Sequence, residues 1–160
     1  MAPSPKHIAA QFVLVDILKK YYKTVGIELE VPVPNPERYY DNNARTIKEY
    51  VLDVYAGEPL VDDITTHWQI GVELDGKTGH KKTRHQFLRD EARTKALEMY
   101  YNIKIFRFDI EDIVGRGQRK KGTVHFKPLI KEIDICKEIG ITLTLPKNYV
   151  PKRGIPLVKQ

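Results

Sequence analysis

Apolar side chains recur along the first third of the chain with two different spacings. Over residues 8–18 they recur every three or four positions, which predicts an amphipathic helix at residues 6–23 that Gly26 ends. Over residues 27–33 they alternate with polar residues and prolines, which predicts a half-buried strand. The chain is therefore expected to begin with a helix followed by a strand.

Two further segments carry strand patterns. Residues 50–55 are dense in β-branched and aromatic side chains, which favours a strand there over a helix ended by Gly57. Residues 67–75 have the pattern of a central strand, in which alternate positions share a face. One face of that strand is expected to carry Trp68, Ile70, Val72 and Leu74.

A long helix and a fourth strand follow. Residues 82–100 carry the clearest helical pattern, and residues 103–108 carry a strand pattern. The helical pattern places four apolar residues on one arc: Leu88, Ala92, Ala96 and Met99. The order helix, three strands, helix, strand predicts an α/β fold with a mixed sheet of four to five strands, because a crossing helix joins parallel neighbours.

The last third of the chain is basic and rich in glycine before it becomes apolar again. Residues 115–122 are predicted to form a basic loop, and residues 123–126 a short strand. Pro128 is predicted to open a last helix that Gly140 closes.

Length and composition narrow the class of protein. The 160 residues suit one domain, which we place at residues 1–145, with an extended basic tail at residues 146–160. A net charge of +6 and a pI near 9.3 suit a polyanionic partner, nucleic acid first, and equally suit a soluble protein with a lysine-rich surface. The single cysteine, Cys136, excludes an intrachain disulfide and a cysteine-based zinc site. With no signal-peptide pattern and no apolar run near the ~20 residues of a membrane span, we expect a cytoplasmic protein without a membrane partner.

The strongest chemical signal is a pair of carboxylates at the end of the predicted central strand. Because alternate strand residues share a face, Val72 and Leu74 should point into the core, while Glu73 and Asp75 point together out of the other face. Two adjacent carboxylates repel, and each raises the pKa of the other, unless a cation joins them. Hard oxygen ligands suit Mg²⁺ or Mn²⁺. The alternative is a solvated edge before a turn.

A metal site that acts on a phosphodiester also needs another acid and several cations. Asp53 lies within a strand pattern and is favoured for the acid, whereas Asp62 and Asp63 compete with it and equally suit a surface turn. The candidate cations follow the central strand: Lys77, His80, Lys81, Lys82 and Arg84.

These residues resemble a known signature. Val72-Glu73-Leu74-Asp75-Gly76, then His80, Asp90, Arg93 and Leu97, then Ile105-Phe106-Arg107-Phe108 resemble small PD-(D/E)XK nucleases, and within them the very-short-patch-repair endonuclease-like branch. Those proteins carry E-x-D-G, then a histidine, then a helix with Asp and Arg, then a strand that ends in Arg-Phe. The resemblance covers residues 67–112 well and residues 8–66 loosely, and it does not extend to residues 113–160.

The resemblance implies a restriction-endonuclease-like fold and divalent-metal cleavage of phosphodiester bonds. It implies that Glu73 is the (D/E) residue, and that Asp75 stands where the wider superfamily has its lysine, with Lys77 as a substitute. His80 takes the place of the branch's histidine, a general base or a phosphate contact. Spacing in the branch favours Asp62 or Asp63 as the first aspartate, whereas the strand pattern favours Asp53, so this ligand stays open. Asp90 and Arg93 would support the site or form a local ion pair.

The sequence thus predicts a Mg²⁺- or Mn²⁺-dependent DNA nuclease with little sequence specificity, since phosphate contacts position a substrate without reading it. One alternative is a nucleic-acid-binding module that has lost catalysis, and another is a structural or interaction protein. A homodimer is compatible with the nuclease. The expected DNA contacts are Lys81, Lys82, Arg84, Arg116, Arg119, Lys120 and Lys121.

Overall fold

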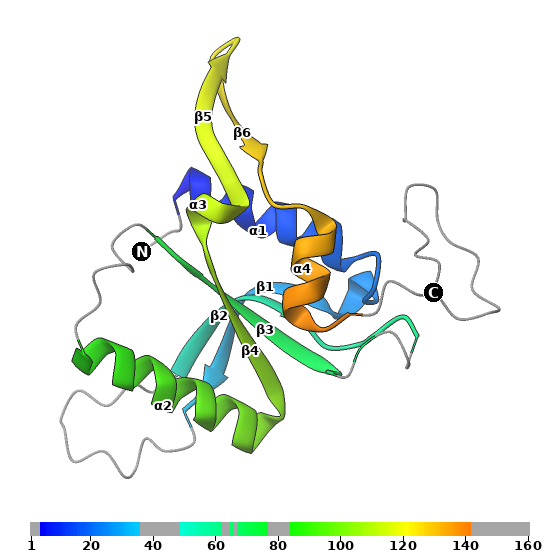
Figure 1. Ribbon diagram of the computed structural model, residues 1–160, viewed down its shortest axis with the longest axis vertical. Helices are drawn as coiled ribbons and strands as arrows, with labels where there is room; N and C mark the ends of the chain where they lie inside the picture. The colour runs from blue at the N-terminus through cyan, green and yellow to red at the C-terminus, as the bar shows by residue number, and fades with distance from the viewer. Residues whose placement is uncertain (1–3, 36–48, 62–64, 66, 77–83, 142–160) are drawn as a thin grey trace.

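The protein contains two sheets and four α-helices within the described part of the chain (Figure 1). The computed structural model describes residues 4–35, 49–61, 65, 67–76 and 84–141. The elements are α1 (Pro5–Leu18), a 3₁₀ turn η1 (Thr24–Gly26), β1 (Ile27–Pro34), β2 (Glu49–Ala56), β3 (Gln69–Asp75), α2 (Arg84–Tyr101), β4 (Ile103–Asp109), α3 (Ile110–Ile113), β5 (Val114–Lys120), β6 (Thr123–Pro128) and α4 (Glu132–Ile139).

The main sheet has four strands in the order β1-β2-β3-β4. β1, β2 and β3 form an antiparallel meander, and β4 pairs with β3 in parallel after α2 has crossed between them. The predicted α/β fold with a mixed four-stranded sheet is therefore confirmed. β5 and β6 form a separate two-stranded sheet.

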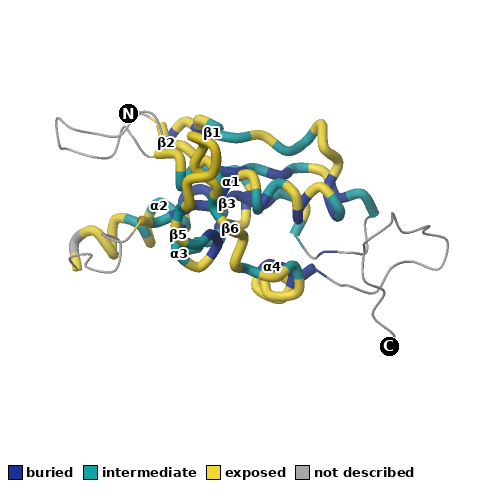
Figure 2. The backbone as a smooth tube through the Cα atoms, turned by 90° about the horizontal axis from the view of Figure 1, so that it is seen from above, coloured by how far each residue is buried: buried dark blue, intermediate teal, exposed yellow. Residues whose placement is uncertain are grey.

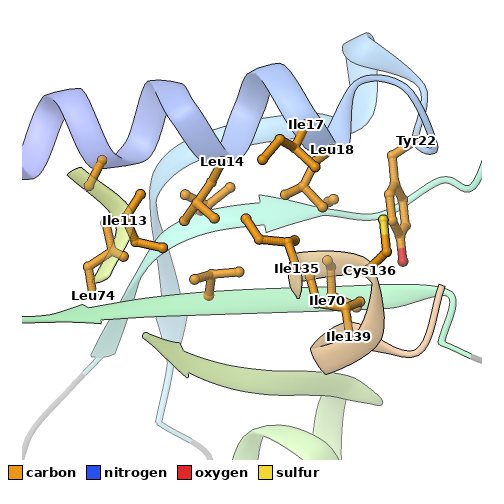
Figure 3. Close-up of a cluster of buried hydrophobic side chains, with 14 of the residues drawn as sticks. Leu14, Ile17, Leu18, Tyr22, Ile70, Leu74, Ile113, Ile135, Cys136 and Ile139 are labelled. Carbon is orange, nitrogen blue, oxygen red and sulfur yellow. The ribbon is translucent and has the colours of Figure 1, made fainter. Parts of the chain in front are cut away.

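The larger core lies on the face of the main sheet that α1 and α4 cover (Figure 3). Leu14 and Leu18 of α1 meet Ile70 of β3 and Ile135 of α4, and all four are fully buried. Cys136 belongs to this core, and burial raises the pKa of its thiol to about 11.

A smaller core lies on the opposite face, where α2 packs. Leu97 of α2 contacts a cluster that includes Leu52 of β2 and Ile105 of β4. Gly71 of β3 leaves room for this packing, because a Cβ there would lie 3.0 Å from methyl groups of both Leu52 and Ile105. β3 therefore presents Ile70, Val72 and Leu74 to the α1 side and its odd-numbered residues to the α2 side.

β1 and β2 change the face that they bury at Glu30 and Asp53. Glu30 has a left-handed backbone conformation with φ 51°, which residues other than glycine seldom adopt within a strand. The neighbouring pairs fall in different cores: Leu29 and Val54 pack on the α1 side, whereas Val31 and Leu52 pack on the α2 side. This irregularity turns Glu30 and Asp53 toward α1.

The predicted burial was wrong in two places. Trp68 is 54% exposed, because β3 begins only at Gln69 and the alternation does not extend back to it. Of the predicted arc on α2, Ala96 is buried beside Leu97, whereas Leu88, Ala92 and Met99 are exposed, because the helix meets the sheet near Leu97. In the described ranges, no helix combines the length and apolarity that crossing a membrane would require.

The C-terminal third also differs from the prediction. The segment at residues 115–122 is a strand and a tight turn, not a loop, because it pairs with β6. Pro128 ends β6, so α4 begins four residues later at Glu132, and Gly140 closes it with φ 83° as expected. The expected tail at residues 146–160 lies outside the described residues.

We predict that two leucines of α2 differ sharply in their contribution to stability. Leu97→Ala should lower the free energy of unfolding by about 2–5 kcal/mol, because it leaves a cavity in a closed core. Leu88→Ala should cost about 1 kcal/mol or less, since this side chain is half exposed. Urea unfolding of the two variants measures the difference, and equal losses would contradict the described packing of α2.

Candidate functional site

The site begins where β2 and β3 separate. The backbone register of these strands runs from Ala56–Ile70 to Val54–Val72. Past that pair, the N–H of Leu74 donates to Asp53 Oδ2 at 2.7 Å, so a carboxylate takes the place of a strand carbonyl. A backbone amide at the end of β3 therefore bonds to a side chain of β2.

An arginine from α2 spans the opening between the same two strands. Arg93 Nη2 lies 2.7 Å from Glu73 Oε1 of β3 and donates to the carbonyl of Val51 of β2 at 2.9 Å. Its guanidinium also lies 4.9 Å from the centre of the Tyr50 ring, within cation–π distance. Arg93 thus ties α2 to both strands.

The separation leaves a cleft of about 560 Å³ between the strand ends and α2. Its lining is dominated by charge of both signs. The carboxylates are Asp53, Glu73, Asp75 and Asp90, and the guanidinium groups belong to Arg89, Arg93 and Arg107.

Glu73 is the most enclosed of these charges, with 4% of its surface exposed. Arg107 of β4 places Nη1 2.7 Å from Glu73 Oε2, so both carboxylate oxygens are in ion pairs with arginines. Burial nevertheless raises the pKa of Glu73, because removal from water outweighs the attraction of Arg93 and Arg107.

The expected sharing of a face by Glu73 and Asp75 is confirmed by their common cleft. Arg107 Nη1 lies 4.0 Å from Asp75 Oδ1 and 3.8 Å from Asp90 Oδ2, in addition to its contact with Glu73. The cation that joins the carboxylates in this structure is therefore an arginine side chain.

A second group of ionisable side chains lies on the other side of Asp53. His7 Nε2 is 3.1 Å from Asp53 Oδ1 and 3.5 Å from Glu30 Oε1. Gln11 of α1 donates to Glu30 Oε1 at 2.7 Å and to the carbonyl of Asp53 at 2.9 Å. Ser4 caps the first turn of α1 by accepting from the N–H of His7, which fixes His7 at the start of the helix.

The side chains of His7, Glu30 and Asp53 could together hold a metal ion. One atom each from His7, Glu30 and Asp53 lies within 4.8 Å of the others. Burial raises the pKa of Asp53, although the Leu74 amide and His7 both favour its charged form. Asp53 is common to this group and to the cleft, so it links α1 to the ends of β2 and β3.

Several predicted site residues are placed, and others are not. Asp53, Glu73 and Asp75 meet at the cleft as expected. Arg84 begins α2 and is exposed, and it is not among the described residues that line the cleft. Outside the described residues lie Asp62, Asp63, Lys77, His80, Lys81 and Lys82. Four predicted DNA contacts lie on the β5–β6 hairpin and not at the cleft: Arg116, Arg119, Lys120 and Lys121.

The sequence did not indicate His7 or Glu30. His7 precedes the apolar positions of α1, and Glu30 is one of two alternating glutamates in β1, so neither stands out. The sequence also did not indicate that Arg93 and Arg107 both pair with Glu73, because these contacts depend on how α2 and β4 pack. Comparisons of the chain with protein-family models, with curated proteins and with solved structures find no match.

We predict that Asp53→Asn stabilises the fold at neutral pH. A carboxyl whose pKa is raised by folding favours the folded state below its unfolded pKa, and loses that advantage as pH rises through the folded pKa. Asparagine can still accept from the Leu74 amide and carries no buried charge. The melting temperature of the variant in EDTA should therefore exceed that of the wild type, with a gap that widens from about pH 4 to pH 7. A gap that narrows over this range would show that the carboxylate is favoured by folding.

We also predict that Arg93→Ala weakens the fold by about 2–3 kcal/mol. The substitution leaves buried Glu73 with one arginine and removes the donor to Val51. Lys95→Ala, on an exposed position of α2, is the control and should change the free energy of unfolding by less than about 0.5 kcal/mol. If denaturant unfolding gives equal values for the two variants, Arg93 does not hold the strands.

Proposed function

We propose that this chain is a divalent-metal-dependent nuclease that hydrolyses phosphodiester bonds of DNA on a restriction-endonuclease-like fold. The order of elements supports the fold, since α1, the β1–β3 meander, α2 and parallel β4 follow the arrangement that the sequence resemblance implies. The observation that carries the function is the meeting of Asp53, Glu73 and Asp75 in one open cleft with arginines.

The cleft has the charges that a phosphodiester reaction uses. Guanidinium groups suit the two anionic oxygens of a phosphate, because they donate in a planar fork. A Mg²⁺ or Mn²⁺ ion held by the carboxylates would lower the pKa of a bound water and stabilise charge on phosphorus. Arg89, Arg93 and Arg107 would bind and orient the scissile phosphate. Lys77 and His80 stay candidates for positioning the attacking water.

The donor set fits a hard divalent ion in its chemistry, because it consists of carboxylate oxygens. Both oxygens of Glu73 are already in ion pairs at 2.7 Å. Each carboxylate oxygen has a second lone pair, so a metal ion could bind Glu73 beside Arg93 and Arg107 or displace one of them. Under this proposal a displaced guanidinium would face the cleft and contact the phosphate when substrate enters.

The His7 group offers a second set of donors for the same ion or for another. An imidazole with two carboxylates suits Mn²⁺ or Zn²⁺ better than Mg²⁺, which prefers oxygen ligands and water. Asp53 belongs to both sets, so its removal should affect metal binding whichever set is used.

A second candidate function is a nucleic-acid-binding module without catalysis. The observation that favours it is that two arginines already compensate the charge of Glu73. The absence of a lysine at the position that Asp75 occupies also favours this candidate, because the nucleases that the sequence resembles usually have a lysine there. In this case the arginines would act as structural partners of Glu73, and the cleft would not cut DNA.

We predict metal-dependent cleavage that needs Asp53 and Glu73. End-labelled duplex and single-stranded DNA are incubated with the protein in Mg²⁺, Mn²⁺ or EDTA. Asp53→Asn and Glu73→Gln should each lower the cleavage rate by about 100-fold or more, because each removes a negative ligand while keeping the side-chain shape. Glu91→Gln, at an exposed position on α2, is the matched control and should cut at the wild-type rate.

The outcomes separate the candidates. DNA that is bound but uncut in both metals would support the binding module. Equal cleavage by the wild type and Glu73→Gln would show that the activity comes from a contaminant. Electron paramagnetic resonance of added Mn²⁺ then locates the ion: Asp53→Asn should lose binding, and comparison of Glu73→Gln with His7→Gln shows which donor set holds it.

A further inference from the structure

β5 and β6 form a two-stranded ribbon that projects from the body of the protein (Figure 1). Lys120 pairs with Thr123, and the two residues between them, Lys121 and Gly122, have positive φ angles of 52° and 81°. Positive φ at both central residues is the type I′ geometry, which matches the twist of a tight hairpin. Both strands are exposed along most of their length (Figure 2).

The two faces of the ribbon differ in chemistry. Residues directly opposite each other in an antiparallel pair lie on the same face. One face carries Gly117 opposite Phe126, and Arg119 opposite Val124 nearer the turn. A Cβ on Gly117 would lie 2.7 Å from Val124 and 2.9 Å from Phe126, so these apolar side chains cover the glycine. Phe126 also packs against the larger core, which directs this face toward the body.

The other face is entirely polar. It carries Gln118 opposite His125 and Lys120 opposite Thr123, and all four are exposed. Each of these side chains can donate a hydrogen bond, and three of them can also accept one. Such a face suits a partner that offers both acceptors and donors.

The charge of the ribbon has one sign. Residues 114–128 contain no aspartate or glutamate, and their cations are Arg116, Arg119, Lys120, Lys121 and Lys127. Within the ranges that the structure describes, no acidic side chain pairs with these five cations. Like charges this close repel one another, so the ribbon is complementary to a polyanion.

We propose that the β5–β6 ribbon enters the major groove of duplex DNA with its polar face toward the bases. The major groove, about 12 Å wide, admits a two-stranded ribbon, and the flanking cations would lie against phosphates. A single strand is a poorer partner, because such sites stack successive bases on aromatic side chains. Residues 114–128 contain no tyrosine or tryptophan, and their one phenylalanine, Phe126, packs against the larger core. The inference rests on the proposed function only in taking nucleic acid as the partner.

Binding is tested with the full chain in EDTA, so that cleavage plays no part. Fluorescence anisotropy measures the affinity for a duplex and for a single strand of equal length at several salt concentrations. The double variant Lys120→Ala/Lys121→Ala should bind the duplex about 10-fold more weakly, because Lys120 loses its contact with the base edges and Lys121 its contact with a phosphate. The salt slope should be lower by about 1, since one phosphate contact is lost. The single strand should bind more weakly than the duplex to the wild type.

The matched control removes the same charge elsewhere. Lys95→Ala/Lys137→Ala, at exposed positions on α2 and α4, should bind the duplex within about twofold of the wild type. An equal loss in this control would overturn the proposal, since net charge alone would then explain binding. Wild-type affinity in Lys120→Ala/Lys121→Ala would overturn the proposal as well. Tighter binding to vesicles of anionic lipid than to the duplex would do the same.

The groove is identified by chemical protection. Guanine N7 faces the major groove, so the wild-type protein should protect it from dimethyl sulfate, and the Lys120→Ala/Lys121→Ala variant should not. Binding without N7 protection would overturn insertion in the major groove. Failure of the cleavage assay leaves this result unaffected, because neither measurement needs metal, so the two proposals can fail separately.

Discussion

A buried carboxylate that must be compensated organises the centre of this molecule. Glu73 lies on a central strand with almost no contact with water, where an unpaired charge would be costly. Its two partners come from different elements, Arg93 from α2 and Arg107 from β4. Because both arginines must reach Glu73, the two ion pairs constrain how α2 and β4 pack against β3. Burial still outweighs their attraction and raises the pKa of Glu73, so charge at this point is held at the expense of stability.

The same region shows why the cleft is where it is. β1 and β2 change faces at Glu30 and Asp53, and β2 parts from β3 beyond Val54 and Val72. Beyond that point, backbone groups that have no partner in the opposite strand bond to side chains instead. The Leu74 amide donates to Asp53 and the Val51 carbonyl accepts from Arg93, so charged side chains gather at the opening. Asp53 contacts both α1 and β3, so a change at the cleft can reach the first helix through one residue.

The main sheet could be predicted from the sequence because its strands obey local rules. Alternation in residues 27–33 and 67–75 gave two strands, and the same rule placed Glu73 beside Asp75. Local rules could not indicate the left-handed backbone of Glu30, or the arginine contacts of Glu73, because both depend on tertiary packing. The segment at residues 115–122 was predicted as a loop because its glycines and cations show no alternation of apolar side chains, and its pairing with β6 leaves no mark in that segment alone.

One backbone group offers a direct view of the site. The amide of Leu74 belongs to β3, and its N–H donates to the side chain of Asp53 in β2 where a strand pair would use a main-chain carbonyl. Its magnetic environment and its exchange with deuterium must therefore follow the ionisation and ligation of that carboxylate. A single peak in a nitrogen–proton spectrum can thus act as a gauge of site occupancy, readable in solution without any substrate.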